Sequence, residues 1–288
     1  MIPLVDYALY PGCLVSNRYP HLELAVRKIA ETLGVSLEDM QGTSCCPEPQ
    51  GIQSTDKRTW MTLAARNIAI AEEMGKDILT LCNGCFETLK SVNIRLKRHP
   101  ELKEDVNQTL ATIDKEYKGN IQVKNIIHVF DDIGITTMAL KIENPMTHIR
   151  TAVHYGCHML RPSDILEVVA ADRPTMLDYL VELTGARPVE YEGKVHCCGY
   201  TVRNFDPMLS MKIAGDKLFN IQRSGANCVT LLCPCCFSTF DTRQAMINRA
   251  LGTSYNIPAF HYAELLALSL GYSPRELELH RHRVKLPV

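Results

Sequence analysis

The chain has 288 residues, of which 46% are hydrophobic and 22% are charged, and its formal net charge is -1. This length predicts two domains of ordinary size, and this balance is typical of a soluble globular protein. The near-zero charge excludes a general attraction to nucleic acid or to an anionic membrane.

The beginning of the chain has neither a basic leader nor a long apolar core, so we do not expect a signal peptide at residues 1–6. No apolar run approaches the roughly 20 residues that span a bilayer. We therefore expect a cytoplasmic protein with no direct membrane insertion, so that any membrane association would need a partner. Because thiols stay reduced in the cytoplasm, spaced cysteines there favour metal ligands or catalysts over disulfides.

Alternating helices and strands are predicted in the first half. Two runs have apolar residues at helical spacing and stop at a glycine, which favours a helix C-terminus: residues 22–33 before Gly34, and residues 59–74 before Gly75. Residues 77–81 form a short apolar run that indicates a buried strand, and helical spacing resumes over residues 86–96. The charged stretch 97–118 indicates a solvated helical surface or a linker.

The second half shows the same alternation. Residues 150–154 and 229–232 indicate strands, and helical spacing covers residues 176–183 and 208–223, each followed closely by a glycine. Alternation of this kind predicts an α/β fold with mostly parallel strands flanked by helices. Ligands in such folds bind beyond the carboxyl ends of the strands.

Ten of the twelve cysteines form one pattern written twice: a single cysteine, an adjacent pair, and a CxxC. The first copy is Cys13, Cys45, Cys46, Cys82 and Cys85, and the second is Cys157, Cys197, Cys198, Cys233 and Cys236. Only Cys228 and Cys235 are left over. The residues around each CxxC also match, which indicates a duplicated domain with halves at 1–145 and 146–288. The spacing between copies is far too long for a solenoid repeat.

Each CxxC follows a predicted strand and would begin a helix, where the helix N-terminus stabilises thiolates. Four thiolates suit either zinc or an iron–sulfur cluster. A fifth cysteine and an adjacent pair argue against zinc, because structural zinc sites are closed by four ligands and neighbouring side chains rarely reach one ion. Five thiolates on one cluster require that one sulfur bridges two irons, or that one iron carries two sulfurs.

This double motif resembles the CCG-domain family, and the whole chain resembles the heterodisulfide reductase B subunits of methanogenic archaea. The resemblance implies two pseudo-two-fold CCG domains and two non-cubane [4Fe-4S] clusters facing each other across a cavity. It assigns one cluster to each cysteine set. It also implies a substrate, the mixed disulfide CoM-S-S-CoB, which would be cleaved to two thiols by one electron from each side.

There are two departures from the family pattern. The first copy reads Cys45-Cys46-Pro47 where the family has glycine, whereas the second keeps Gly199. This difference puts the local backbone turn in question but leaves the ligands in place. Cys235, inside the second CxxC, could compete with Cys233 or Cys236 as a ligand.

Several other residues are candidates for the chemistry. His154 and His158 flank Cys157, and either could donate a proton to a leaving thiolate or bond to a cluster sulfide or the backbone instead. Anionic groups on the implied substrate need cationic or N–H donors. Three arginines close to the cysteines could supply them, although each taken alone is more often a surface charge: Arg18, Arg161 and Arg203.

The chain has no ferredoxin-type cysteine run, no G-x-G-x-x-G and no P-loop, so electrons must come from a partner. The resemblance implies two partner proteins. One is a ferredoxin-like C subunit, and the other is a flavin-bearing A subunit that is linked to a hydrogenase or formate dehydrogenase. Three alternatives remain: a CCG electron-relay protein of a lactate, glycolate, fumarate or quinone-linked system, a zinc-stabilised binding module, and a metal-free thiol oxidoreductase.

Overall fold

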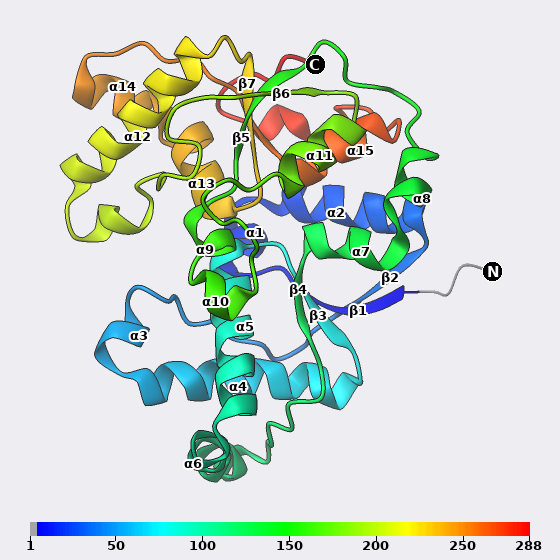
Figure 1. The fold of residues 1–288 in the computed structure, drawn as a ribbon, viewed down its shortest axis with the longest axis vertical. Helices are drawn as coiled ribbons and strands as arrows, with labels where there is room; N and C mark the ends of the chain where they lie inside the picture. Colours follow the sequence, from blue (N-terminus) through cyan, green and yellow to red (C-terminus); the bar gives the residue numbers. More distant parts are fainter. Residues whose placement is uncertain (1–4) are drawn as a thin grey trace.

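The computed structural model describes residues 5–288, so the expectation about the N-terminal leader falls largely outside the described residues. Within that range each half of the chain builds one four-stranded sheet, and every strand pair is parallel (Figure 1). The strands of the first sheet are β1 (Val5–Tyr10), β2 (Val35–Asp39), β3 (Asp77–Thr80) and β4 (Val123–Asn125). Those of the second are β5 (Arg150–His154), β6 (Arg187–Val189), β7 (Cys228–Leu231) and β8 (Ala259–His261). The orders β2-β1-β3-β4 and β6-β5-β7-β8 correspond strand for strand, which confirms the duplicated α/β fold.

Two helices of the first half, α2 and α4, end where the sequence predicts, and α5 runs two residues past its predicted end at 96. They are α1 (Cys13–Arg18), α2 (Pro20–Leu33), α3 (Ile52–Thr55), α4 (Lys57–Met74), α5 (Asn83–Arg98), α6 (Pro100–Leu110), α7 (Val129–Ile133) and α8 (Ile135–Ala139). Gly34 and Gly75 cap α2 and α4 in the left-handed conformation. The charged stretch 97–118 contains α6, whose Val106 and Leu110 are buried, so it covers the core on one face and meets solvent on the other.

The second half repeats this plan with one long helix interrupted. Its helices are α9 (Cys157–Leu160), α10 (Ser163–Leu166), α11 (Met176–Leu183), α12 (Pro207–Arg223), α13 (Pro234–Phe237), α14 (Gln244–Leu251) and α15 (Tyr262–Ser269). After the first CxxC, α5 runs unbroken for 16 residues. After the second, the chain forms α13, a π-helical segment η4 (Ser238–Thr242) and then α14. Such π segments often accompany functional sites.

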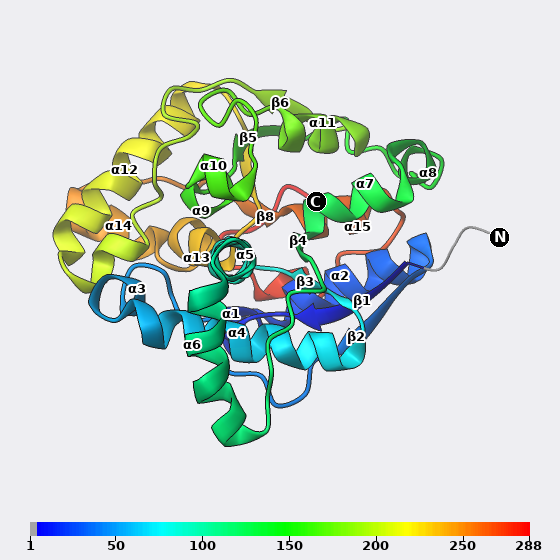
Figure 2. The same ribbon diagram turned by 60° about the horizontal axis from the view of Figure 1, so that its bottom comes forward.

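The two halves share one continuous hydrophobic core. Helix α2 of the first half packs against α15 of the second, and α5 packs against α9 and α10 (Figures 1 and 2). Lys90 on α5 adds a polar link, because its Nζ donates to the carbonyl of Leu166 at 2.9 Å. No helix among residues 5–288 is long and apolar enough to cross a membrane. The boundary between residues 145 and 146 stays a prediction.

Candidate metal centre

Parallel pairing brings the cysteines of each half to one sheet edge. In the first sheet Tyr10 pairs with Thr80, so the segments that follow β1 and β3 leave the sheet side by side. Cys13 begins α1 on one segment, and Cys82 caps α5 on the other. In the second sheet β5 and β7 pair in the same way, with His154 opposite Leu231. Each cysteine set therefore assembles beyond the carboxyl ends of two neighbouring strands, as the sequence indicates.

The two sets meet in a single cavity of about 290 Å³ between the halves. Its walls hold all ten cysteines of the double motif and also Cys235: Cys13, Cys45, Cys46, Cys82, Cys85, Cys157, Cys197, Cys198, Cys233, Cys235 and Cys236. All twelve cysteines of the chain have free thiols. The twelfth, Cys228, is completely buried on β7, away from this cavity.

A close approach between the two sets joins the first cysteine of each CxxC. Cys82 Sγ and Cys233 Sγ lie 3.9 Å apart, and Cys235 Sγ lies within 4.8 Å of both. The interface there is fixed by Asn83, whose Nδ2 donates to the carbonyl of Tyr155 at 2.7 Å. Cys235 thus sits at the seam between the two sets, in a position that Gly84 occupies in the first CxxC.

Matched glycines allow the backbone to approach the CxxC sulfurs closely. Gly12 and Gly156 each precede the first cysteine of a set and have the same φ of 79°. A Cβ on Gly12 would lie 2.9 Å from Cys85 Sγ, and one on Gly156 would lie 2.8 Å from Asn83 Nδ2. Only glycine adopts this backbone region without strain and leaves room for the facing atoms.

The buried thiols cannot all ionise without a compensating cation. Contacts with Cys45 and Cys85 lower the pKa of Cys46 to about 6, whereas the contact with Cys46 raises the pKa of Cys85 well above that of a free thiol. In the second set, contacts with Cys198 and Cys233, together with burial, raise the pKa of Cys236 in the same way. One thiol in each group of neighbours can therefore ionise, and its negative charge opposes the ionisation of the next. A positively charged metal core resolves the conflict, so this donor set fits an iron–sulfur centre.

The two cysteine sets differ in the buried polar residue that the neighbouring long helix places next to each adjacent pair. Helices α4 and α12 are both capped by an aspartate, Asp56 and Asp206, and eleven residues later they carry Asn67 and Lys217 respectively. Asn67 is neutral and binds the backbone before the first cysteine pair, accepting from Ser44 N–H at 3.0 Å. At the equivalent place, Lys217 donates to the carbonyl of His196 at 2.6 Å, and burial lowers its pKa to about 8.

Lys217 also fixes the orientation of His154. Lys217 Nζ lies 3.0 Å from His154 Nδ1, and His154 Nε2 lies 3.3 Å from Cys236 Sγ. Because an ammonium can only donate, Nδ1 must accept and the ring proton must sit on Nε2, facing the sulfur. His154 is buried behind Cys236 and does not line the cavity. Tyr10 takes the place of His154 in the first half and donates instead to the Ser44 carbonyl at 2.5 Å.

The other candidate residues separate into those at the cavity and those away from it. His158 and Arg203 line it, and His158 Nε2 contacts Gln50 of the first half. Burial lowers the pKa of His158, and the negative charges of Cys233 and Cys197 oppose that shift. Arg203 lies over the ring of Tyr200 at 3.9 Å. Arg18 and Arg161 are exposed and do not belong to the cavity wall; Arg161 pairs with Asp172 at 3.4 Å.

Sequence reasoning missed the polar part of the wall. It comes from the residues that follow each adjacent pair and from α5: Glu48, Gln50, Asn83, Tyr200 and Thr201. Only their position in the sequence could have indicated them, because the segment after each adjacent cysteine pair runs directly along the cavity. Nothing in their residue types singles them out.

The Cys-Cys-Pro departure produces a different turn and leaves both Cys45 and Cys46 at the cavity wall. Gly199 has a φ of 81°, and a Cβ there would lie 2.6 Å from the carbonyl oxygen of Ser210. The first half has Pro47 at this place, and its carbonyl accepts from Thr88 Oγ1 at 3.1 Å. Helix α5 therefore supports the first turn through a side chain, whereas the second turn packs directly on α12.

Comparison with known proteins gives three findings. The CCG family of cysteine-rich domains matches residues 7–90 and 151–241. The chain is 41% identical over 98% of its length to the B subunit of the ferredoxin/F420H2-dependent CoB–CoM heterodisulfide reductase of Methanosarcina acetivorans, covering 95% of that relative. It is 29% identical to the membrane anchor subunit of the 8-methylmenaquinol:fumarate reductase of Wolinella succinogenes, with 96% of each chain covered.

A solved structure shares the fold. The crystal structure of a hypothetical protein from Helicobacter pylori superposes with a TM-score of 0.81 at 13% identity. The alignment covers 99% of this chain and 53% of that one. This likeness extends the architecture to a distant protein and carries no functional information.

Proposed function

Because the chain belongs to the CCG family of cysteine-rich domains, and within it to the heterodisulfide reductase B subunits, we propose that it is the catalytic subunit of a CoB–CoM heterodisulfide reductase. The reaction is CoM-S-S-CoB plus two electrons and two protons, giving two thiols. The observation that carries the proposal is the single cavity lined by two complete cysteine sets, with sulfurs of the two CxxC motifs 3.9 Å apart.

That geometry matches a reaction at two adjacent sulfur atoms. The bond in a disulfide is about 2 Å long, so both of its sulfurs fit within one small cavity. A cavity closed on opposite sides by equivalent cysteine sets offers each substrate sulfur its own wall. An electron relay needs neither a substrate cavity nor two sets that face each other.

We assign one non-cubane [4Fe-4S] cluster to each set. The first is held by Cys13, Cys45, Cys46, Cys82 and Cys85, and the second by Cys157, Cys197, Cys198, Cys233 and Cys236. When bound, such clusters supply electrons one at a time. Cys235 lines the same cavity, and its Sγ lies within 4.8 Å of the sulfurs of Cys82 and Cys233. It is therefore placed to contact either set or the substrate.

Residues of the cavity wall would bind and protonate the substrate. Arg203 is placed to bind an anionic group of either coenzyme, because its guanidinium is at the wall and its stacking on Tyr200 limits its motion. His158 is the better placed of the two histidines to donate a proton to a released thiolate, because its ring reaches the cavity. His154 instead donates through Nε2 toward Cys236, which assigns it to the support of a ligand. Arg18 and Arg161 are not part of the cavity wall, so we leave them out of the proposed substrate site.

Electrons must reach this site from other proteins. We propose that a ferredoxin-like C subunit is the immediate donor and that a flavin-bearing A subunit lies behind it, fed by a hydrogenase or formate dehydrogenase module. The relative from Methanosarcina acetivorans is named for ferredoxin and F420H2 as donors, so the ultimate donor varies within the family. The free thiols suit a reducing compartment, and we propose that the complex works in the cytoplasm.

Turnover with an artificial donor tests the proposal. The chain is loaded with clusters under anaerobic conditions and then supplied with a reduced dye as electron donor and with CoM-S-S-CoB as substrate. We expect one CoM thiol and one CoB thiol for every two electrons consumed. Cys157→Ala should abolish turnover, whereas Cys228→Ala, which alters a buried thiol outside the cavity, should retain it.

The alternative function is electron relay within another oxidoreductase, favoured by the similarity to one component of a fumarate reductase. It predicts clusters that the dye reduces and a disulfide that is never consumed. That result, obtained with fully loaded protein, would reject the catalytic assignment and leave the metal centre in place.

A further inference from the structure

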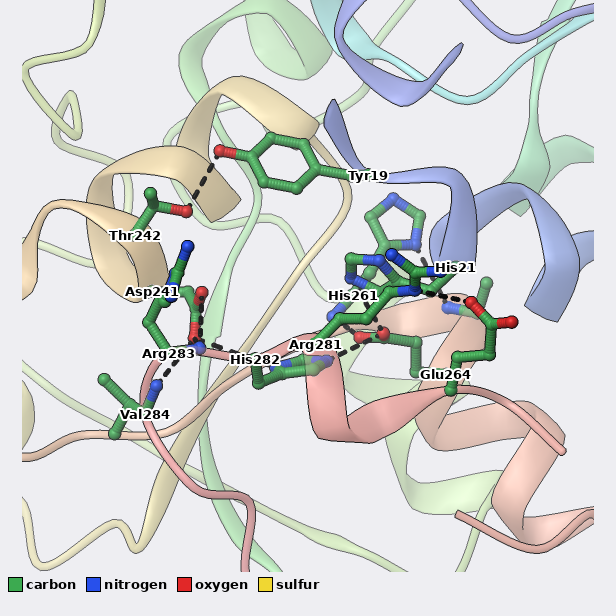
Figure 3. Close-up of polar contacts among 12 residues, drawn as sticks. Tyr19, His21, Asp241, Thr242, His261, Glu264, Arg281, His282, Arg283 and Val284 are labelled. Carbon is green, nitrogen blue, oxygen red and sulfur yellow. Dashed lines mark hydrogen bonds and ion pairs between the residues drawn. The ribbon is translucent and has the colours of Figure 1, made fainter. Parts of the chain in front are cut away.

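A second group of metal-binding side chains lies outside the cysteine cavity, between α2 and α15 (Figure 3). It consists of His21 on α2, Glu264 on α15 and His282 in the C-terminal segment, with their ligand atoms all within 4.8 Å of one another. The three side chains are at most 2% exposed. The first belongs to one half of the molecule and the other two to the second half.

His21 is the unexplained member of the group. Neither of its ring nitrogens has a hydrogen-bond partner among the described residues, although the side chain is only 2% exposed. Burial lowers its pKa to about 4, so the imidazole is neutral and both its lone pair and its N–H are unused. A buried polar group without a partner costs about 1–3 kcal/mol. Its Nε2 faces Glu264 Oε1 at 3.7 Å, beyond hydrogen-bond range, which leaves a gap between them.

Glu264 presents one oxygen to this gap and uses the other elsewhere. Its Oε2 accepts from the backbone N–H of His261 at 2.9 Å, as part of the cap of α15. Its Oε1 faces both histidines, at 2.9 Å from His282 Nε2 and 3.7 Å from His21 Nε2. One carboxylate oxygen and two imidazole nitrogens therefore converge on one point.

His282 has a carboxylate behind its far nitrogen. Its Nδ1 has no hydrogen-bond partner among the described residues, and Asp241 Oδ1 lies 3.8 Å from it, on the side away from Glu264. Asp241 is itself fixed, because Oδ1 accepts from the N–H groups of Arg283 at 2.9 Å and Val284 at 3.0 Å (Figure 3). A carboxylate behind the far nitrogen of a ligating histidine is a recurrent support of zinc sites.

We propose that His21, Glu264 and His282 bind one divalent transition-metal ion, of which zinc is the best match, and that the ion holds the two halves of the molecule together. Two imidazoles and one carboxylate, with a water molecule in the fourth position, are a common zinc donor set, whereas calcium and magnesium need mostly oxygen ligands. Tetrahedral zinc bonds of about 2.0–2.2 Å place neighbouring ligand atoms roughly 3.3–3.6 Å apart. His21 Nε2, now 3.7 Å from Glu264 Oε1, must therefore move slightly toward it, and His282 Nε2, now 2.9 Å away, must move slightly apart.

Such an ion would act on the cysteine cavity through the fold. Helix α2 directly follows α1, which begins with Cys13, and α1 contacts α13, which Cys233 caps and which contains Cys236. Cross-linking α2 to α15 therefore restrains the relative position of the two cysteine sets. The role is structural, and the ion takes no part in electron transfer because zinc has no redox chemistry.

Metal counting with X-ray absorption tests the proposal on the cluster-loaded chain. We expect about one zinc per chain, in addition to the iron, with a shell of nitrogen and oxygen near 2.0 Å rather than sulfur near 2.3 Å. The contrast in distance separates this site from zinc bound adventitiously to cysteines. Zinc in a sulfur shell, or protein that binds no zinc when supplied with it, would overturn the proposal and leave a proton-bridged His282–Glu264 pair.

Variants provide the matched comparison. His21→Gln and His282→Gln should each lose the zinc while iron and sulfide stay unchanged. His280→Gln, in the same C-terminal segment but exposed, should keep it. A selective zinc chelator should lower the Tm of the wild-type protein and of His280→Gln but not that of His21→Gln. If a Gln variant does not fold, the zinc shell and the chelator response of the wild-type protein decide the question.

Discussion

Replacing Gly12 by alanine should remove the first cluster while leaving the second intact. The new Cβ would lie 2.9 Å from Cys85 Sγ, whereas unstrained nonbonded contacts are about 3.5–4.0 Å. The sulfur must therefore move by at least about 0.6 Å. Metal–ligand distances tolerate only about 0.2 Å, so Cys85 cannot stay in place as a ligand.

The backbone contributes to the same effect. Gly12 has φ 79° and ψ 160°, a region that is strained by about 1–3 kcal/mol for other residues. Gly34 offers a matched control, because its φ of 71° is also positive but a Cβ there would meet no described atom within 4 Å. Gly34→Ala should cost about 1–2 kcal/mol of stability and leave ligands undisturbed.

Iron and acid-labile sulfide per chain, with EPR of the remaining cluster, measure the outcome. We expect about eight irons in the wild-type protein and in Gly34→Ala, and about four in Gly12→Ala. A Gly12→Ala protein that keeps eight irons and an unaltered EPR spectrum would refute the reasoning that this glycine makes room for the ligand.

Three further substitutions probe the cavity and its surroundings. Lys217→Met removes the cation behind His154 and should lower the midpoint potential of the second cluster by tens of millivolts. The control Lys212→Met, which changes an exposed lysine on the same helix, should leave the potential unchanged. Equal potentials in the two variants would show that Lys217 does not tune the cluster. Arg203→Met should raise KM for the disulfide about tenfold or more with cluster content unchanged, because a charge-assisted hydrogen bond is lost; a similar rise in exposed Arg161→Met would indicate a non-specific charge effect. His158→Gln should reduce kcat about 100-fold with little change in KM, and an undiminished kcat in single-turnover assays would exclude it as the proton donor.

The cysteine pattern predicted the architecture because ligand spacing and strand–helix alternation are both written locally. The strand at residues 150–154 and the helix at 176–183 coincide with β5 and α11, and the predicted strand at 77–81 is one residue longer than β3. The glycines after α2 and α4 fix those helix ends through left-handed caps, which depend on the glycine alone.

Elements fixed by tertiary contact were beyond the sequence. Residues 5–10 form β1, one of the two inner strands of the first sheet. Residues 262–269 form α15, which is buried on all sides and so lacks an amphipathic period. The sequence could not show which arginines line the cavity. Arg203 and Arg161 are comparably close to a cysteine in sequence, but only Arg203 lies at the cavity wall. The approach of His21 to Glu264 brings together the two halves, and no local pattern predicts such a proximity.

The central claim is that two iron–sulfur clusters face one cavity and act together on a disulfide. It is tested most directly by counting iron and acid-labile sulfide in the anaerobically purified chain and recording EPR after CoM-S-S-CoB is added under oxidising conditions. The account predicts about eight irons and eight sulfides per chain and a new paramagnetic signal that requires the disulfide. Clusters that are present in full but show no response to the disulfide would contradict it.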